Sequence, residues 1–187
     1  MGVDVSKILA GPVDVFAGPV GITEPTLADF LTFDFVAGGW RDCGGSNGGV
    51  KMVIAQSFGK VTADQTVDIL GSLASERSVT CELSLLESTM DNWKMANNGG
   101  TVVTGANGSS FEPVTNTVTT PPEYQAMALR GTSAMNGKKS VLILRRTLTT
   151  SDVAWSHVKD NAVMFGITKT SHYVSAVKGP FAFLQGN

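Results

Sequence analysis

The clearest pattern of apolar and polar positions lies at residues 79–85, where the two kinds of side chain alternate. One face of this stretch would collect the apolar residues Val79, Cys81, Leu83 and Leu85. A period of two is typical of a half-buried β-strand. The pattern changes at Ser88, which can cap a short helix, with Asp91 three residues later as a shorter capping-box acid. Asn98-Gly99-Gly100 would end that helix, so the segment predicts a strand that runs into a helix.

Further apolar runs predict that strands dominate the chain. They lie at residues 13–20, 31–36, 50–58, 67–70, 162–167 and 173–177. The run 31–36 would place Phe33 and Phe35 on one face, and the segment 38–49, which holds six glycines, would be a loop. We expect a loose hairpin with its turn at Asn107-Gly108, and a helix at 152–165 is an alternative to strands there. The fold class predicted is mainly β: an antiparallel β-sandwich or barrel with one flanking α-helix and long loops.

Asn136-Gly137 is the strongest turn signal, and it predicts a two-residue hairpin between residues 124–135 and 138–148. In that register Leu129 faces Leu144, and Arg130 faces Ile143. The core face would hold Met127, Leu129, Leu142 and Leu144, and the other face Ala128, Arg130, Val141, Ile143 and Arg145. The second face suits either an assembly interface or a further layer of the same domain.

Composition limits the function classes that remain. The 187 residues fit one domain, and charged residues make up only 16%. This low charge favours a surface covered by other subunits, although a neutral monomer surface also explains it. A net charge of −2 without a basic run is unlike a tight nucleic-acid binder, and no apolar stretch is long enough to span a membrane. Lys7 and Asp14 do not fit a secretory leader.

Catalytic chemistry has little support in the sequence. His157 and His172 lie in no zinc-binding motif, and the glycine-rich segment lacks the Gly-Lys-Ser/Thr of a phosphate loop. Cys43 and Cys81 fit reduced thiols better than a disulfide framework. We therefore expect no catalytic residue, no cofactor-binding residue and no metal ligand, and we do not expect an enzyme.

The order of several segments resembles the major tail tube proteins of long-tailed (siphovirus-type) bacteriophages. These segments are TFDFVAGGWRDCGGSNGGVKM at 32–52, Val61-Thr62-Ala63-Asp64-Gln65, the alternating strand that ends Leu85-Leu86-Glu87, and the helix that begins Ser88-Thr89-Met90-Asp91-Asn92. The resemblance covers roughly the first hundred residues, and beyond them only the general β character is similar.

The resemblance implies a structural virion protein. Subunits of that family form hexameric rings that stack into the tail tube, a conduit through which DNA passes into the host. A single tail-tube-like domain at 1–187 would carry a glycine-rich assembly loop at about 37–70. Taken with the mixed face of the predicted hairpin, the subunit-interface candidates are Trp40, Val50, Met52, Phe58, Arg130, Ile143 and Arg145.

The resemblance also implies partners and a location. These are further copies of the chain, a tape-measure protein, tail terminator and baseplate proteins, and double-stranded DNA that passes without specific binding. No membrane partner is expected. The protein would lie in the virion tail after assembly in the host bacterial cytoplasm. The alternatives are a tail-terminator or head–tail joining protein that forms a single ring, and a monomeric β-sandwich binding module.

Overall fold

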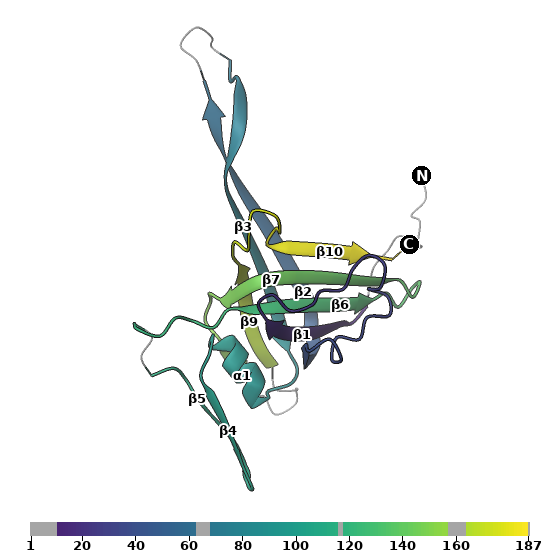
Figure 1. The fold of residues 1–187 in the computed structure, drawn as a ribbon, viewed down its shortest axis with the longest axis vertical. Helices are drawn as coiled ribbons and strands as arrows, with labels where there is room; N and C mark the ends of the chain where they lie inside the picture. The colour runs from purple at the N-terminus through teal and green to yellow at the C-terminus, as the bar shows by residue number, and fades with distance from the viewer. Residues whose placement is uncertain (1–10, 63–67, 116–117, 157–163, 187) are drawn as a thin grey trace.

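The structure, a computed structural model, describes residues 11–62, 68–115, 118–156 and 164–186. It is mainly antiparallel β-sheet with one short helix, so the predicted fold class is confirmed (Figure 1). The strands are β1 (Val13–Pro19), β2 (Arg41–Val61), β3 (Gly71–Leu85), β4 (Thr101–Gly105), β5 (Gly108–Glu112), β6 (Gln125–Thr132), β7 (Lys139–Thr149), β8 (Ala154–Ser156), β9 (Met164–Ser171) and β10 (Phe181–Gln185), and the helix is α1 (Met90–Ala96).

The main sheet closes on itself. Its strand order is β10-β7-β6-β1-β2-β3-β9-β8, and an additional pairing of β7 with β9 joins six of these strands into a barrel. β9 and β10 follow one another along the same side of β7, because Ser171 pairs with Thr147 and Phe181 pairs with Leu144. The residues between them leave the sheet. Within the described residues β10 therefore has β7 as its only partner strand.

The barrel interior is the main core, and the alternation of residues 79–85 is confirmed there. Val79, Cys81, Leu83 and Leu85 are each at most 4% exposed. α1 packs against this core through Met95 and Ala96, and the Trp93 ring meets the Phe165 ring at 4.8 Å. The predicted cap of α1 is wrong by one residue: Thr89 accepts a hydrogen bond from the Asn92 backbone N–H at 3.2 Å.

A second layer, residues 20–40, covers the outer face of β1, β6 and β7. Its side chains Phe30, Phe35 and Trp40 are buried against Phe16, Ala126, Ala128, Val141 and Ile143. The outer face of the β6–β7 hairpin is thus covered by the same chain at Val141 and Ile143. The predicted strand at 31–36 is wrong, because this segment turns: Trp40 N donates to Phe35 O, and Gly38 N donates to Asp34 O. These local bonds satisfy the backbone while the aromatic rings pack inward.

The β6–β7 hairpin has the predicted faces but not the predicted register. Ser133 N donates to Lys138 O at 2.8 Å, which closes a loop of residues 134–137 instead of a two-residue turn. Leu129 therefore faces Leu142, not Leu144, and Arg130 faces Val141, not Ile143. A shift of two residues leaves every side chain on its original face.

The glycine-rich segment predicted as a loop is wrong: from Arg41 onward it is strand β2. Gly44, Gly48 and Gly49 have positive φ angles, and the register shifts between Ser46 and Val50. Glycine takes this conformation without strain, so these residues form bulges that let the strand continue.

The remaining predictions have mixed outcomes. The hairpin near residue 107 is confirmed as β4–β5, but its turn is Ala106-Asn107, one residue earlier. Residues 173–177 are not a strand, and β10 was not predicted. A helix at 152–165 is wrong at β8 and at the start of β9, and 157–163 lie outside the described residues. Residues 68–70 precede β3 without being a strand.

Candidate assembly surface

β2 and β3 extend beyond the barrel as a two-stranded arm, which we define as residues 53–61 and 71–78. β1 pairs with β2 only between Arg41 and Gly45, and β9 pairs with β3 only from Val79 onward. In the described part of the chain, the two arm strands therefore pair only with each other. The arm projects away from the barrel, at the end opposite the β4–β5 hairpin (Figure 1).

The arm exposes apolar side chains. Phe58 is 58% exposed and Leu73 is 68% exposed. The exposed apolar residues of the arm and its adjoining tip are Val53, Ile54, Phe58, Val61, Ile69, Leu70 and Leu73. Large exposed apolar patches mark interaction sites, and unpaired strand edges favour pairing with another chain. The arm is the strongest candidate for an assembly surface.

The register assigns the arm residues to two faces, because residues directly opposite one another in an antiparallel pair share a face. Ile54 pairs with Val79, a core residue, so its side of the arm continues the core face of the barrel. We call this the inner face, and its residues are Ile54, Gln56, Phe58 and Lys60 with Arg77, Ala74 and Ser72. The outer face holds Val53, Ala55, Ser57, Gly59 and Val61 with Ser78, Glu76, Leu73 and Gly71.

A second exposed surface lies at the other end of the molecule. We call it the base, and its residues are Leu86, Glu87, Asp91, Val103, Glu112, Asp152 and Trp155. These residues flank the end of β3, the start of α1, the β4–β5 hairpin and β8. β3 has 15 residues, so at about 3.3 Å per residue its two ends lie roughly 50 Å apart. The base therefore combines exposed apolar and acidic side chains far from the arm.

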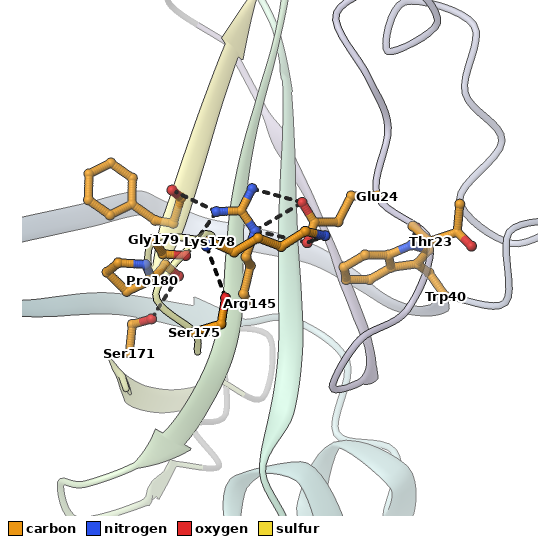
Figure 2. A network of polar contacts seen from close by, with 10 residues as sticks. Thr23, Glu24, Trp40, Arg145, Ser171, Ser175, Lys178, Gly179 and Pro180 are labelled. Atoms are coloured by element: carbon orange, nitrogen blue, oxygen red, sulfur yellow. Dashed lines mark hydrogen bonds and ion pairs between the residues drawn. The ribbon is translucent and has the colours of Figure 1, made fainter. Parts of the chain in front are cut away.

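Arg145 does not lie on a free surface but holds three segments together (Figure 2). Its guanidinium donates to both Glu24 carboxylate oxygens at 2.9–3.0 Å and to the carbonyls of Gly179 and Phe181. Lys178 lies 3.6 Å from the same carboxylate. Burial raises the pKa of Glu24, but the hydrogen bonds and charge of Arg145, with Lys178, outweigh it and hold the pKa below its ordinary value.

The other predicted interface residues fall into four groups. Trp40 and Ile143 are at most 2% exposed, and Trp40 Nε1 donates to Thr23 O at 2.9 Å. Val50 and Met52 are partly buried against the barrel core. Arg130 pairs with Asp14 at 2.9 Å and lies over the Phe16 ring. Phe58 alone of the seven is largely exposed, on the inner face of the arm.

The assembly loop expected at about 37–70 included Ile54 and Lys60, but sequence patterns did not identify Leu73 and Arg77 as surface candidates. Leu73 and Arg77 precede the strongly alternating part of β3, where no core imposes a period of two. Pairing between residues 53–61 and 71–78 is the signal that identifies them, because it places all four side chains on one exposed hairpin.

The buried ionisable groups lie inside the barrel. Burial raises the pKa of Cys43 to about 11 and that of Cys81 to about 12. Lys169 is 1% exposed and donates to Met95 O at 2.8 Å, and burial lowers its pKa to about 8. Among the described residues, no three or more His, Cys, Asp or Glu side chains converge as metal ligands would. Cys43 and Cys81 belong to the barrel core, and the Lys169 bond to Met95 O joins β9 to the helix.

Neither a protein-family model nor a curated protein matches this chain. In the described ranges, no helix has the length and apolar character needed to cross a membrane. The geometry of the arm, the base and the barrel, together with the sequence resemblance, is therefore the basis for inferring a function.

Proposed function

We propose that this chain is a structural subunit that assembles with copies of itself into a tube like that of the major tail tube proteins of long-tailed bacteriophages. The arm is the observation that carries the proposal. A two-stranded hairpin alone is marginally stable in water, and this one exposes apolar side chains such as Phe58 and Leu73. A second copy packed on the arm would bury these side chains and pair its edges.

The positions of the two hairpins support stacking in one direction. The arm and the β4–β5 hairpin project from opposite ends of the subunit (Figure 1). Contact between different surfaces of two copies is heterologous, and it builds an open filament when the rotation between copies does not close. Stacked rings that form a tube are an assembly of this kind.

The barrel edge and the charge of the chain support the remaining parts of the proposal. β10 leaves one edge without a partner strand among the described residues, and a neighbour in a hexameric ring would occupy it. The chain has a net charge of −2 and no basic run, which suits a conduit that must release DNA. Tape-measure, terminator and baseplate proteins would be further partners, in a virion tail assembled in the bacterial cytoplasm.

Electron microscopy of the purified protein with sedimentation analysis tests the proposal directly. We expect long hollow tubes of stacked rings. Isolated rings would favour the alternative, a tail-terminator or head–tail joining protein. A monomer that persists at high concentration would contradict both and favour a monomeric binding module.

A shortened arm makes the test specific. Ile54 pairs with Val79, so residues 55–78 can be replaced by Asn-Gly, the preferred two-residue hairpin turn. This variant keeps the core residue Val79 and all pairings of β1 and β9. We expect a folded subunit, by circular dichroism, that no longer forms tubes. Normal tube formation by this variant would remove the main support for the proposal.

A further inference from the structure

Four asparagines in this chain are followed directly by glycine, and this pair of residues is chemically labile. They are Asn47, Asn98, Asn107 and Asn136. Because glycine has no side chain, its backbone nitrogen can approach closely and attack the Cγ atom of the preceding asparagine. The four pairs lie in different surroundings, and these surroundings decide whether the two atoms can meet.

The pair at Asn98 is held on both sides of the reaction. Its amide bonds Thr149 twice, since Oδ1 accepts from Thr149 N at 2.7 Å and Nδ2 donates to Thr149 O at 2.8 Å. The attacking nitrogen is engaged as well, because Gly99 N donates to Lys94 O at 3.1 Å. All three hydrogen bonds must break before the ring can close.

The pair at Asn136 is held in a similar way inside the β6–β7 loop. Asn136 Oδ1 accepts from Lys138 N at 3.1 Å. Gly137 N, the attacking nitrogen, donates to Ser133 O at 2.8 Å. This loop therefore fixes both the amide and the nitrogen.

The pair at Asn47 is exposed but lies within a strand of the main sheet. It occupies the bulge of β2, and ladder pairs at Ser46 and Val50 hold the strand on either side. Gly48 has a φ angle of 76°, so the bulge also fixes the backbone at the attacking residue. The barrel thus limits the movement that this pair needs.

The pair at Asn107 lies at the tip of the β4–β5 hairpin, and both Asn107 and Gly108 are exposed. The tip is closed by a pairing of Gly105 with Gly108, two residues of high conformational freedom. β4 and β5 form a sheet of two strands, and such a hairpin is marginally stable in water, so its tip opens readily. A Cβ added at Gly108 would meet no atom within 4 Å, which shows the open space around this residue.

We propose that Asn107 is the primary site of spontaneous deamidation in this protein. The backbone nitrogen of Gly108 attacks the Asn107 Cγ atom, and the new N–Cγ bond closes a five-membered succinimide. The Cγ–Nδ2 bond breaks, and the Gly108 N–H proton passes through solvent to the leaving amine, which departs as ammonia. Water then opens the ring at one of its two carbonyl carbons and gives aspartate or isoaspartate, without any oxidation or reduction.

Both products change the hairpin. Each adds one negative charge, which takes the net charge of the chain from −2 to −3. Isoaspartate also leads the main chain through the former side-chain Cγ, so the two-residue turn gains a methylene group. Glu112 is the only charged residue in the hairpin sequence, and it pairs with Thr101 at the other end of the ladder. The reaction needs only this chain and water, so it does not depend on the proposed function.

Peptide mass spectrometry tests the proposal on folded protein incubated in mildly alkaline buffer, at a concentration too low for assembly. Trypsin places Asn47 and Asn136 on separate peptides, whereas one peptide, 95–130, holds both Asn98 and Asn107, which fragment spectra distinguish. We expect Asn107 to convert first, about tenfold or more faster than Asn98 and Asn136, because those pairs must break several hydrogen bonds. Labelling by an isoaspartyl methyltransferase identifies the isoaspartate product.

Matched variants and unfolded protein complete the test. Asn107→Gln and Asn136→Gln keep an amide but require a six-membered ring, which closes more slowly. We expect Asn107→Gln to remove most of the early deamidation and Asn136→Gln to leave it unchanged. In urea the four pairs should convert at similar rates, because the fold no longer separates them. Earlier conversion of another Asn-Gly pair in the folded protein, or unchanged early deamidation in Asn107→Gln, would overturn the proposal.

Discussion

The layer of residues 20–40 and the arm show two outcomes for an apolar strand face. The outer face of β1, β6 and β7 is covered by Phe30, Phe35 and Trp40 of the same chain. Both faces of the arm remain bare in the described structure, although they carry residues as apolar as Ile54 and Phe58. The first face stabilises the subunit, and the second is available to another molecule.

This difference shows that an apolar face identifies a surface to be buried but not the chain that buries it. The 20–40 layer is held on the barrel at Glu24, whose carboxylate binds Arg145, and is braced internally at Thr23, whose carbonyl accepts from Trp40. The arm has no comparable cover from the described residues. Substitutions should therefore change subunit stability in the layer and change assembly in the arm.

Trp40→Ala should have the largest effect on the stability of the subunit. The side chain is 2% exposed and packs against Phe35, so its loss leaves a cavity worth about 3–5 kcal/mol. Urea denaturation, at a protein concentration too low for assembly, measures the change in the free energy of unfolding. Leu73→Ala, at an exposed arm position, is the matched control and should change stability by less than about 0.5 kcal/mol. Full stability of Trp40→Ala would return this residue to the list of interface candidates.

Glu24→Gln should lower the free energy of unfolding by about 2 kcal/mol at neutral pH, because Arg145 loses its charged partner but keeps two carbonyl acceptors. The folded pKa of Glu24 lies below its ordinary value of 4.5, so the carboxylate contributes stability above that pH. This contribution is lost as the pH falls through the folded pKa.

Denaturation curves of wild type and Glu24→Gln across about pH 3–7 measure this dependence. We expect the advantage of the wild type to be largest at neutral pH and to shrink in acid. Glu76→Gln, at an exposed arm carboxylate without an ion pair among the described residues, is the control variant. Equal acid sensitivity of the two variants would mean that the Glu24–Arg145 ion pair does not stabilise the 20–40 layer.

The sequence predicted features that a single buried face imposes. The alternation at Val79–Leu85 and the faces of the β6–β7 hairpin are confirmed because the barrel core selects them. The register of that hairpin was missed because loop length, not face, sets it. Phe33 and Phe35 have strand spacing but lie in turns, because their rings pack on the outer face of the barrel, which the local sequence does not reveal.

The candidate site was harder to predict than the fold. Trp40 stands in a glycine-rich segment, and such a position suggests exposure, yet the glycines form bulges in a strand and the ring is buried. The arm lacks a core, so Leu73 and Arg77 carry no periodic signal. Only the pairing of residues 53–61 with residues 71–78 reveals that these side chains share one projection.

Gly48→Ala alters the bulge of β2 that precedes the arm and leaves the exposed side chains of the arm unchanged. Gly48 has a φ angle of 76°, and a Cβ added at this position would meet no atom within 4 Å, so the cost comes from the backbone alone. We expect a loss of about 1 kcal/mol in subunit stability. Gly71→Ala, which has no positive φ and equally open space, is the control and should be neutral or slightly stabilising. If Gly48→Ala assembles normally, the bulge does not set the direction of the arm.

Phe58→Ala should have the smallest effect on the subunit and a large effect on assembly. The ring is 58% exposed, so its removal should change the free energy of unfolding by less than about 0.5 kcal/mol. A large aromatic ring at the centre of an interface often contributes about 2 kcal/mol or more, so we expect about tenfold or greater loss of tube in a pelleting assay. Trp40→Ala would then lower the stability of the subunit, whereas Phe58→Ala would lower the yield of tubes. Loss of stability in Phe58→Ala without loss of assembly would mean that the arm is part of the subunit's own core.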